Sequence, residues 1–125
     1  MRSTAVALVL ALSLSASASA ALAQGFESDV DSIQIVSANV GGKNVFIPST
    51  LVITGGRPVT LSLFNTTDVP HGFAIPGIGV EAIVPVQEEF TIELPALEGG
   101  HVYRVNCQLH PAHRSATLVV LPGKK

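Results

Sequence analysis

The sequence has little cysteine, few charged residues and few residues that favour helices. A single cysteine, Cys107, makes an intrachain disulfide impossible. Tryptophan is absent and the only methionine is Met1, so a mature chain would have no thioether to offer a metal. Charged residues make up 13% of the chain and the net charge is -2, which excludes the strongly basic surface of a nucleic-acid-binding protein.

Long apolar runs are also missing, apart from one at the N-terminus. Arg2 precedes the apolar residues 5–12, and small residues then lead to Ala21-Leu22-Ala23. A basic end, a short apolar core and an A-x-A site predict a secretory signal peptide over residues 1–23. An uncleaved membrane anchor is the alternative, but the run is short for a bilayer. We therefore expect a periplasmic or secreted bacterial protein with no membrane span after cleavage.

Residues 24–125 are predicted to form one domain, in which residues 24–32 are a polar, flexible leader. Short apolar or alternating segments separated by Gly, Pro and Asn predict an all-β fold of about eight strands, arranged as a β-sandwich or small barrel. No helical period occurs anywhere. The expected strands are 33–40, a second stretch made of 45–48 and 51–54, then 58–65, 71–75, 80–84, 88–94, 101–107 and 115–121.

The chemistry-bearing segment is the loop Cys107-Gln108-Leu109-His110-Pro111-Ala112-His113, between the last two predicted strands. Cys and His three residues apart can face one ion, and His71 after Pro70 is a candidate ligand from elsewhere. Alone, Cys107 would read as an inert buried thiol and His71 as a structural histidine. A thiolate with two imidazoles suits copper, whereas Cys with three His also suits zinc. With no Met available, His113 stands where a fourth ligand is expected.

At this point the sequence resembles the cupredoxins, small blue-copper electron carriers with a Greek-key β-sandwich. The resemblance runs from Val45 to Leu121 and rests on these motifs: Phe46-x-Pro48, Asn65 ahead of Pro70-His71-x-Phe73, Tyr103 four residues before Cys107, and Cys107-x-x-His110-x-x-His113. It implies one mononuclear copper ion with His71, Cys107 and His110 as equatorial ligands and His113 as the axial ligand. Asn65 has no implied ligand role.

The run 107–111 also resembles nitrosocyanin, a red copper protein, whose Glu ligand position is occupied here by His71. The resemblance to cupredoxins implies an electron-transfer protein, not an enzyme, whose redox partner docks near His110. Two other functions stay open: copper handling in resistance or delivery, and a catalytic red-copper site.

Other residues are expected to lie outside the metal site. His101 precedes Cys107 by six residues on one strand, roughly 20 Å away, so it is expected on the surface. Glu88, Glu89, Glu93 and Glu98 form either a docking patch for a basic partner or a solvated strand face. Residues 74–80 with Leu109, Pro111 and Ala112 form either an apolar rim around the site or part of the core. Asn65-Thr66-Thr67 matches a glycosylation triplet, but such triplets arise often by chance, so we give this match little weight.

Overall fold

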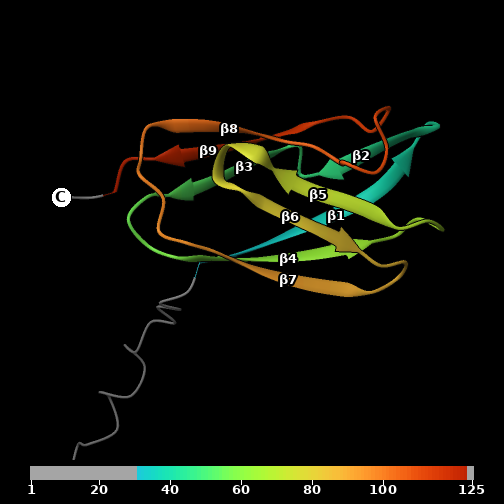
Figure 1. Ribbon diagram of the computed structural model, residues 1–125, viewed down its shortest axis with the longest axis horizontal. Coiled ribbons are helices and arrows are strands. Elements are labelled where there is room, and N and C mark those ends of the chain that lie inside the picture. The colour runs from blue at the N-terminus through green and yellow to red at the C-terminus, as the bar shows by residue number, and fades with distance from the viewer. Residues whose placement is uncertain (1–30, 124–125) are drawn as a thin grey trace, which may run out of the picture.

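A computed structural model describes residues 31–123, which fold into strands and one short 3-10 helix (Figure 1). The elements, in chain order, are β1 Asp31–Val40, β2 Lys43–Ile47, β3 Thr50–Thr54, β4 Val59–Asn65, β5 His71–Ile75, η1 Pro76–Ile78, β6 Val80–Val84, β7 Glu89–Leu94, β8 His101–Val105 and β9 Ala116–Leu121. The predicted all-β fold is confirmed. The predicted signal peptide, residues 1–23, lies outside the described residues.

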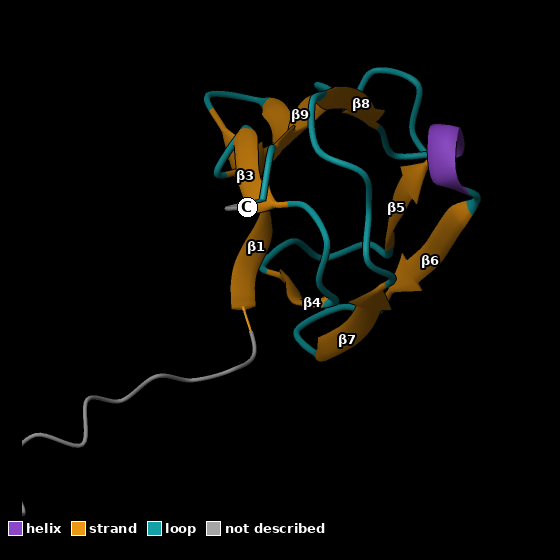
Figure 2. Ribbon diagram, turned by 90° about the vertical axis from the view of Figure 1, so that its left-hand side faces the viewer, coloured by secondary structure: helices purple, strands orange, loops and turns teal. Residues whose placement is uncertain are grey.

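The strands form sheets that enclose one core. The orders are β2-β1-β4-β7, β3-β9-β8 and β5-β6, with β1 parallel to β4 and β3 parallel to β9. Figure 2 looks down the interior and shows the sheets wrapped around it. Because β2 and β3 are consecutive in the chain but belong to different sheets, this connection crosses from one side of the sandwich to the other.

The period-two pattern of the sequence decides which side chains fill the core. In β4, Val59, Leu61 and Leu63 are buried, and Thr60 and Ser62 on the opposite face donate to β7 carboxylates. Successive residues of a strand face opposite sides, so one face supplies apolar area to the interior while the other meets water. The core also takes Phe46 from β2 of the same sheet, and Phe73 and Leu118 from the other two sheets.

Several strand boundaries differ from those expected by one or two residues, and three differences have a structural reason. β1 begins at Asp31, because residues 31 and 32 already pair with β4, so this part of the predicted leader is strand. The expected second stretch is two strands, since Pro48 and Ser49 interrupt it and β3 pairs with β9 instead. β8 ends at Val105, and Cys107 lies beyond it, because Asn106 leaves the ladder to pair with Ala74.

Loops from several sheets meet at one end of the sandwich. Figure 1 shows the β1–β2 hairpin, the β4–β5 loop and the β8–β9 loop at the right-hand end, away from the C-terminus. This arrangement brings His71 and the segment 107–113 together although they are far apart in sequence. Within residues 31–123, no helix has the length and apolar character needed to cross a membrane.

Candidate metal centre

His71 is the first residue of β5 and is completely buried. β5 pairs with β6 so that His71 lies opposite Val84. The loop that delivers His71 runs from Asn65 to Pro70, and its shape is fixed by Asn65, which has no exposed area. The position of His71 is therefore set by a strand pair on one side and a hydrogen-bonded loop on the other.

Asn65 holds that loop through both ends of its side-chain amide. The Nδ2 group donates to the carbonyl oxygens of Val69 (2.8 Å) and Val84 (3.3 Å), and Oδ1 accepts from the Thr67 backbone N–H at 2.9 Å and from its hydroxyl at 2.8 Å. An Asx-type bond of this kind stabilises a tight turn. The glycosylation triplet thus has a buried, fully engaged amide, and the sequence analysis missed this loop-closing role.

Cys107 is held against β5 by the backbone. Ala74 and Asn106 exchange two N–H···O=C bonds of 2.8 and 2.9 Å, which fix the residue before Cys107 to the strand that carries His71. The Gly72 N–H donates to Cys107 Sγ at 3.1 Å, and the cysteine is 5% exposed. The sulfur is therefore buried, faces a backbone donor and is fixed in position relative to β5.

The donor atoms of three residues converge. Cys107 Sγ lies 3.8 Å from His71 Nδ1 and 3.5 Å from His110 Nδ1, and the three ligand atoms all lie within 4.8 Å of one another. His110 is half-buried, and its carbonyl accepts the N–H of His113 at 2.9 Å, which closes a turn in the loop. Two imidazole nitrogens and one sulfur therefore face a common point.

His113 is buried but lies outside this group of three. Its ring packs on Phe46 with centroids 4.2 Å apart and meets the His71 ring at 5.0 Å. His113 Nδ1 lies 2.9 Å from the Arg114 carbonyl oxygen, to which it can only donate, so Nε2 carries the lone pair. Nε2 of His113 and Nε2 of His71 are both buried without a hydrogen-bond partner.

The environment disfavours protonation of the His71 and His113 rings. Burial is the main cause that lowers the pKa of His71, and charge on His113 and His110 lowers it further. Burial also lowers the pKa of His113; its hydrogen bond to the Arg114 carbonyl acts in the opposite direction, and charge on His110 adds to the lowering. Neutral imidazoles are the form that binds a metal ion.

A further contact near the sulfur was not foreseen from the sequence. Gln108 folds back over Gly72, and its Nε2 donates to the Ala82 carbonyl of β6 at 2.9 Å. A Cβ at residue 72 would overlap the Gln108 side-chain amide and lie 2.9 Å from the Gln108 backbone nitrogen. Glycine at 72 therefore makes room for a side chain that ties the ligand loop to β6.

The remaining predicted residues divide between core and surface. His101 is exposed, stacks on Tyr103 and lies 3.8 Å from Glu98, away from the metal centre as expected. Of the possible rim, Ala74 and Ile75 belong to the core, whereas three residues are exposed beside His110: Leu109, Pro111 and Ala112. The four glutamates of the acidic cluster, Glu88, Glu89, Glu93 and Glu98, are solvent-exposed.

Comparison with known proteins places the chain in a family. A family model of the cupredoxin-like domain matches residues 4–120. The chain belongs to the cupredoxin-like family, as the motifs around Cys107 predicted. A search of curated proteins finds no match.

Solved structures share the fold at low sequence identity. The metal-binding domain of the Cu(I)-exporting P-type ATPase CopA of Streptococcus pneumoniae D39 superposes with a TM-score of 0.63 at 16% identity, covering 76% of this chain and 89% of that one. Auracyanin B gives 0.61 at 14% identity, with coverage of 74% and 89%. The copper nitrite reductase of Nitrosomonas europaea gives 0.62 at 14% identity, and the alignment spans 74% of this chain and 42% of that protein.

The donor set fits copper. A buried sulfur with one backbone donor and two imidazole nitrogens at this spacing matches the soft ligands that copper takes in a cupredoxin fold. His113 Nε2 adds a buried lone pair without a partner next to the group, and its Nδ1 contact with a backbone carbonyl is the outer hydrogen bond typical of metal-binding histidines.

Substitution of Gly72 tests the Gln108 contact. Gly72→Ala should displace the Gln108 side chain, break its bond to Ala82 and destabilise the protein by about 1–3 kcal/mol in urea unfolding. Gln108→Ala loses the same hydrogen bond without the overlap and should cost less. The double variant should be more stable than the sum of the two effects predicts; strict additivity would contradict the steric account.

The histidine environment predicts a pH dependence for the metal-free protein. Because the pKa values of His71 and His113 are lowered by folding, the folded state binds fewer protons than the unfolded state below about pH 6.5. Stability should be full above that pH and fall as pH decreases toward the lowered values. Urea unfolding between pH 7.5 and 5 measures this, and His113→Asn should flatten the slope. A stability that rises on acidification would refute the assignment.

Proposed function

We propose that this protein is a single-electron carrier whose one copper ion is held by His71, Cys107 and His110, with His113 as the fourth ligand. The observation that carries the proposal is the convergence of Cys107 Sγ with two imidazole Nδ1 atoms inside a hydrogen-bonded β-scaffold. Copper in such a donor set supplies a one-electron couple. The protein's own part is to hold the ligands in one arrangement for both oxidation states.

The scaffold supports that role because each ligand is restrained independently. His71 sits on a paired strand, Cys107 follows the Ala74–Asn106 bridge, and the turn from His110 to His113 is closed by a backbone bond. The Gly72 N–H moderates the negative charge on Sγ. Ligands that cannot relax keep the geometric change on electron transfer small, which favours a carrier over a site that must open.

The proposed partner docks near His110. His110 is the least buried of the three clustered ligands, and Leu109 beside it is 42% exposed. Pro111 and Ala112 continue this apolar rim. An apolar surface without charged groups lets a partner approach closely and excludes water from the contact, so the ring edge of His110 is the shortest route out of the centre.

We place the protein in the bacterial periplasm or among secreted proteins, on the strength of the signal sequence at residues 1–23. An oxidising compartment would oxidise a free thiol that binds no metal. A role as a metal ligand therefore accounts for a single cysteine in an exported protein. N-terminal sequencing of the exported protein, expected to start at Gln24, tests this placement.

Metal analysis with an optical spectrum and voltammetry tests the function. Protein purified without added metal should contain one copper per chain, show a thiolate-to-copper band and give a fast reversible couple. Cys107→Ser should abolish the band, whereas the control His101→Gln should keep it. Tight Cu(I) binding without a reversible couple would identify a copper-handling protein instead, and a spectrum altered by azide or nitrite would identify a catalytic site. Zinc with no band would overturn the copper assignment.

The fourth ligand has its own test. An imidazole is a stronger donor than a thioether and favours Cu(II), so His113→Met should raise the reduction potential and move the spectrum toward ordinary blue copper. His113→Ala should also change the band. A spectrum identical in the native protein and both variants would show that His113 only packs between Phe46 and His71.

A further inference from the structure

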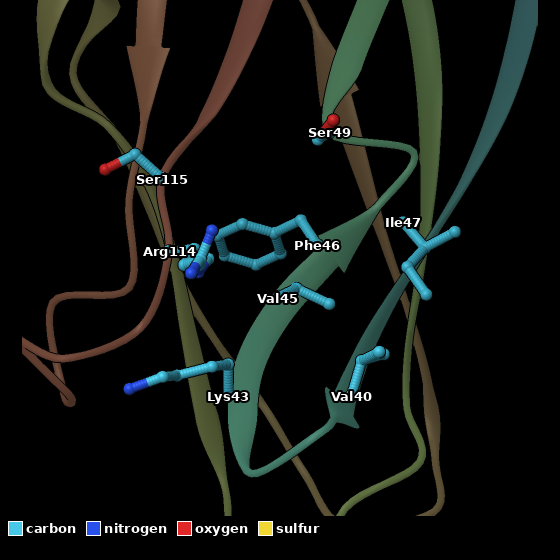
Figure 3. Close-up of a pocket in the computed structure, with 8 residues that line it drawn as sticks. All are labelled: Val40, Lys43, Val45, Phe46, Ile47, Ser49, Arg114 and Ser115. Atoms are coloured by element: carbon cyan, nitrogen blue, oxygen red, sulfur yellow. The ribbon is translucent and has the colours of Figure 1, made fainter.

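An open depression of about 670 Å³ lies between β2 and the segment that follows His113. Figure 3 shows it lined by aliphatic side chains of β1 and β2 with the ring of Phe46, and by Arg114 and Ser115 from the β8–β9 loop. Val40 and Ile47 on its wall are 56% and 47% exposed. Exposed aliphatic groups gathered around a hollow mark a place where another molecule can be bound.

The charge around the depression has one sign. Lys43 and Arg114 line it, and neither forms an ion pair with another residue in the described range. Arg104 adds a third cation through its bonds of 3.0 and 2.8 Å to the Ser115 hydroxyl. No acidic side chain is among the lining residues.

Two exposed glutamates, Glu89 and Glu93, lie on the other edge of the same sheet. The sheet order is β2-β1-β4-β7, so Lys43 on β2 and the glutamates of β7 occupy opposite edges. Glu89 and Glu93 accept hydrogen bonds from Ser62 and Thr60, which holds them on that edge. The two edge strands of this sheet therefore carry charges of opposite sign.

We propose that this basic-rimmed depression docks an acidic protein surface whose central apolar side chain enters the hollow. Carboxylates around that side chain would meet Lys43 and Arg114, and its apolar part would cover Val40 and Ile47. The surface is distinct from the rim at His110, and the inference holds whether or not the copper centre carries electrons. It is nevertheless connected to that centre, because Phe46 at the depression lies against the His113 ring.

A membrane surface fits the depression less well, because it meets protruding side chains, whereas these apolar groups line a hollow. Residues 24–30 carry Glu27 and Asp29 and join β1 at Asp31, and Ile47 lies opposite Val36, five residues along β1, so this segment is the rival occupant from the chain itself. Peptide binding that appears only in a chain lacking residues 24–30 would assign the depression to that segment and overturn the proposal.

Binding of an acidic probe peptide tests the proposal. The reduced protein, purified with its metal, is titrated at low salt with acetyl-Glu-Glu-Phe-Glu-Glu-amide while backbone amide NMR signals are recorded. Shifts should map to Lys43, Val45, Ser49 and Ser115, and binding should weaken as salt is raised. The same peptide with Gln for Glu should bind more weakly. Equal binding of both peptides, no binding, or shifts confined to Leu109 and its neighbours would overturn the proposal.

Matched variants separate the local effect from net charge. Lys43→Gln with Arg114→Gln should weaken peptide binding by about fivefold or more. Gln34→Glu with Thr91→Glu changes the net charge equally at exposed positions away from the depression and should have a smaller effect. An equal effect of both pairs would refute local recognition. If the Lys43→Gln, Arg114→Gln pair weakened binding to anionic phosphatidylglycerol vesicles more than binding to the peptide, the surface would be assigned to a membrane. If the pair weakened self-association more than peptide binding, the surface would be assigned to a second copy of the chain.

Discussion

Two backbone hydrogen bonds between Ala74 and Asn106 are the constraint on which the candidate metal centre depends. They attach the last residue before Cys107 to the strand that begins at His71, and so join the end of β8 to the β5–β6 pair. The Gly72 N–H then reaches the sulfur, and Gln108 reaches β6 on the far side of Gly72. The backbone positions of the first two candidate ligand residues, His71 and Cys107, are thus fixed relative to each other by main-chain hydrogen bonds.

The periodic strands could be predicted from the sequence because their burial follows the alternation of residues. β4, β5 and β6 begin and end within one residue of expectation, and Val59, Leu61 and Leu63 fill the core as their spacing indicates. The separation of β2 from β3 was not predicted, since apolar residues flank Pro48 and Ser49 on both sides. Contacts between residues distant in sequence decide which strands pair across the sandwich. The local pattern of apolar and polar residues does not indicate these contacts.

The candidate ligands were accessible to sequence reasoning because metal coordination restricts both residue type and spacing. Cys107 and His110 lie three apart on one loop, and His71 follows a proline at a strand start, so each has a local signal. Asn65 and Gln108 have none: an amide side chain serves a loop, a cap or a surface equally well. Their roles depend on partners such as Val84 and Ala82, which only folding brings near.

The free edge of β7 has a consequence for the behaviour of the protein at high concentration. Exposed Glu89 and Glu93 alternate along a strand that ends its sheet, with Glu88 just before it. A second molecule that extended the sheet there in antiparallel fashion would set carboxylate against carboxylate along the new ladder. Glu89 and Glu93 therefore discourage fibril growth from the β7 edge, which is the edge of this sheet opposite the β1–β2 hairpin.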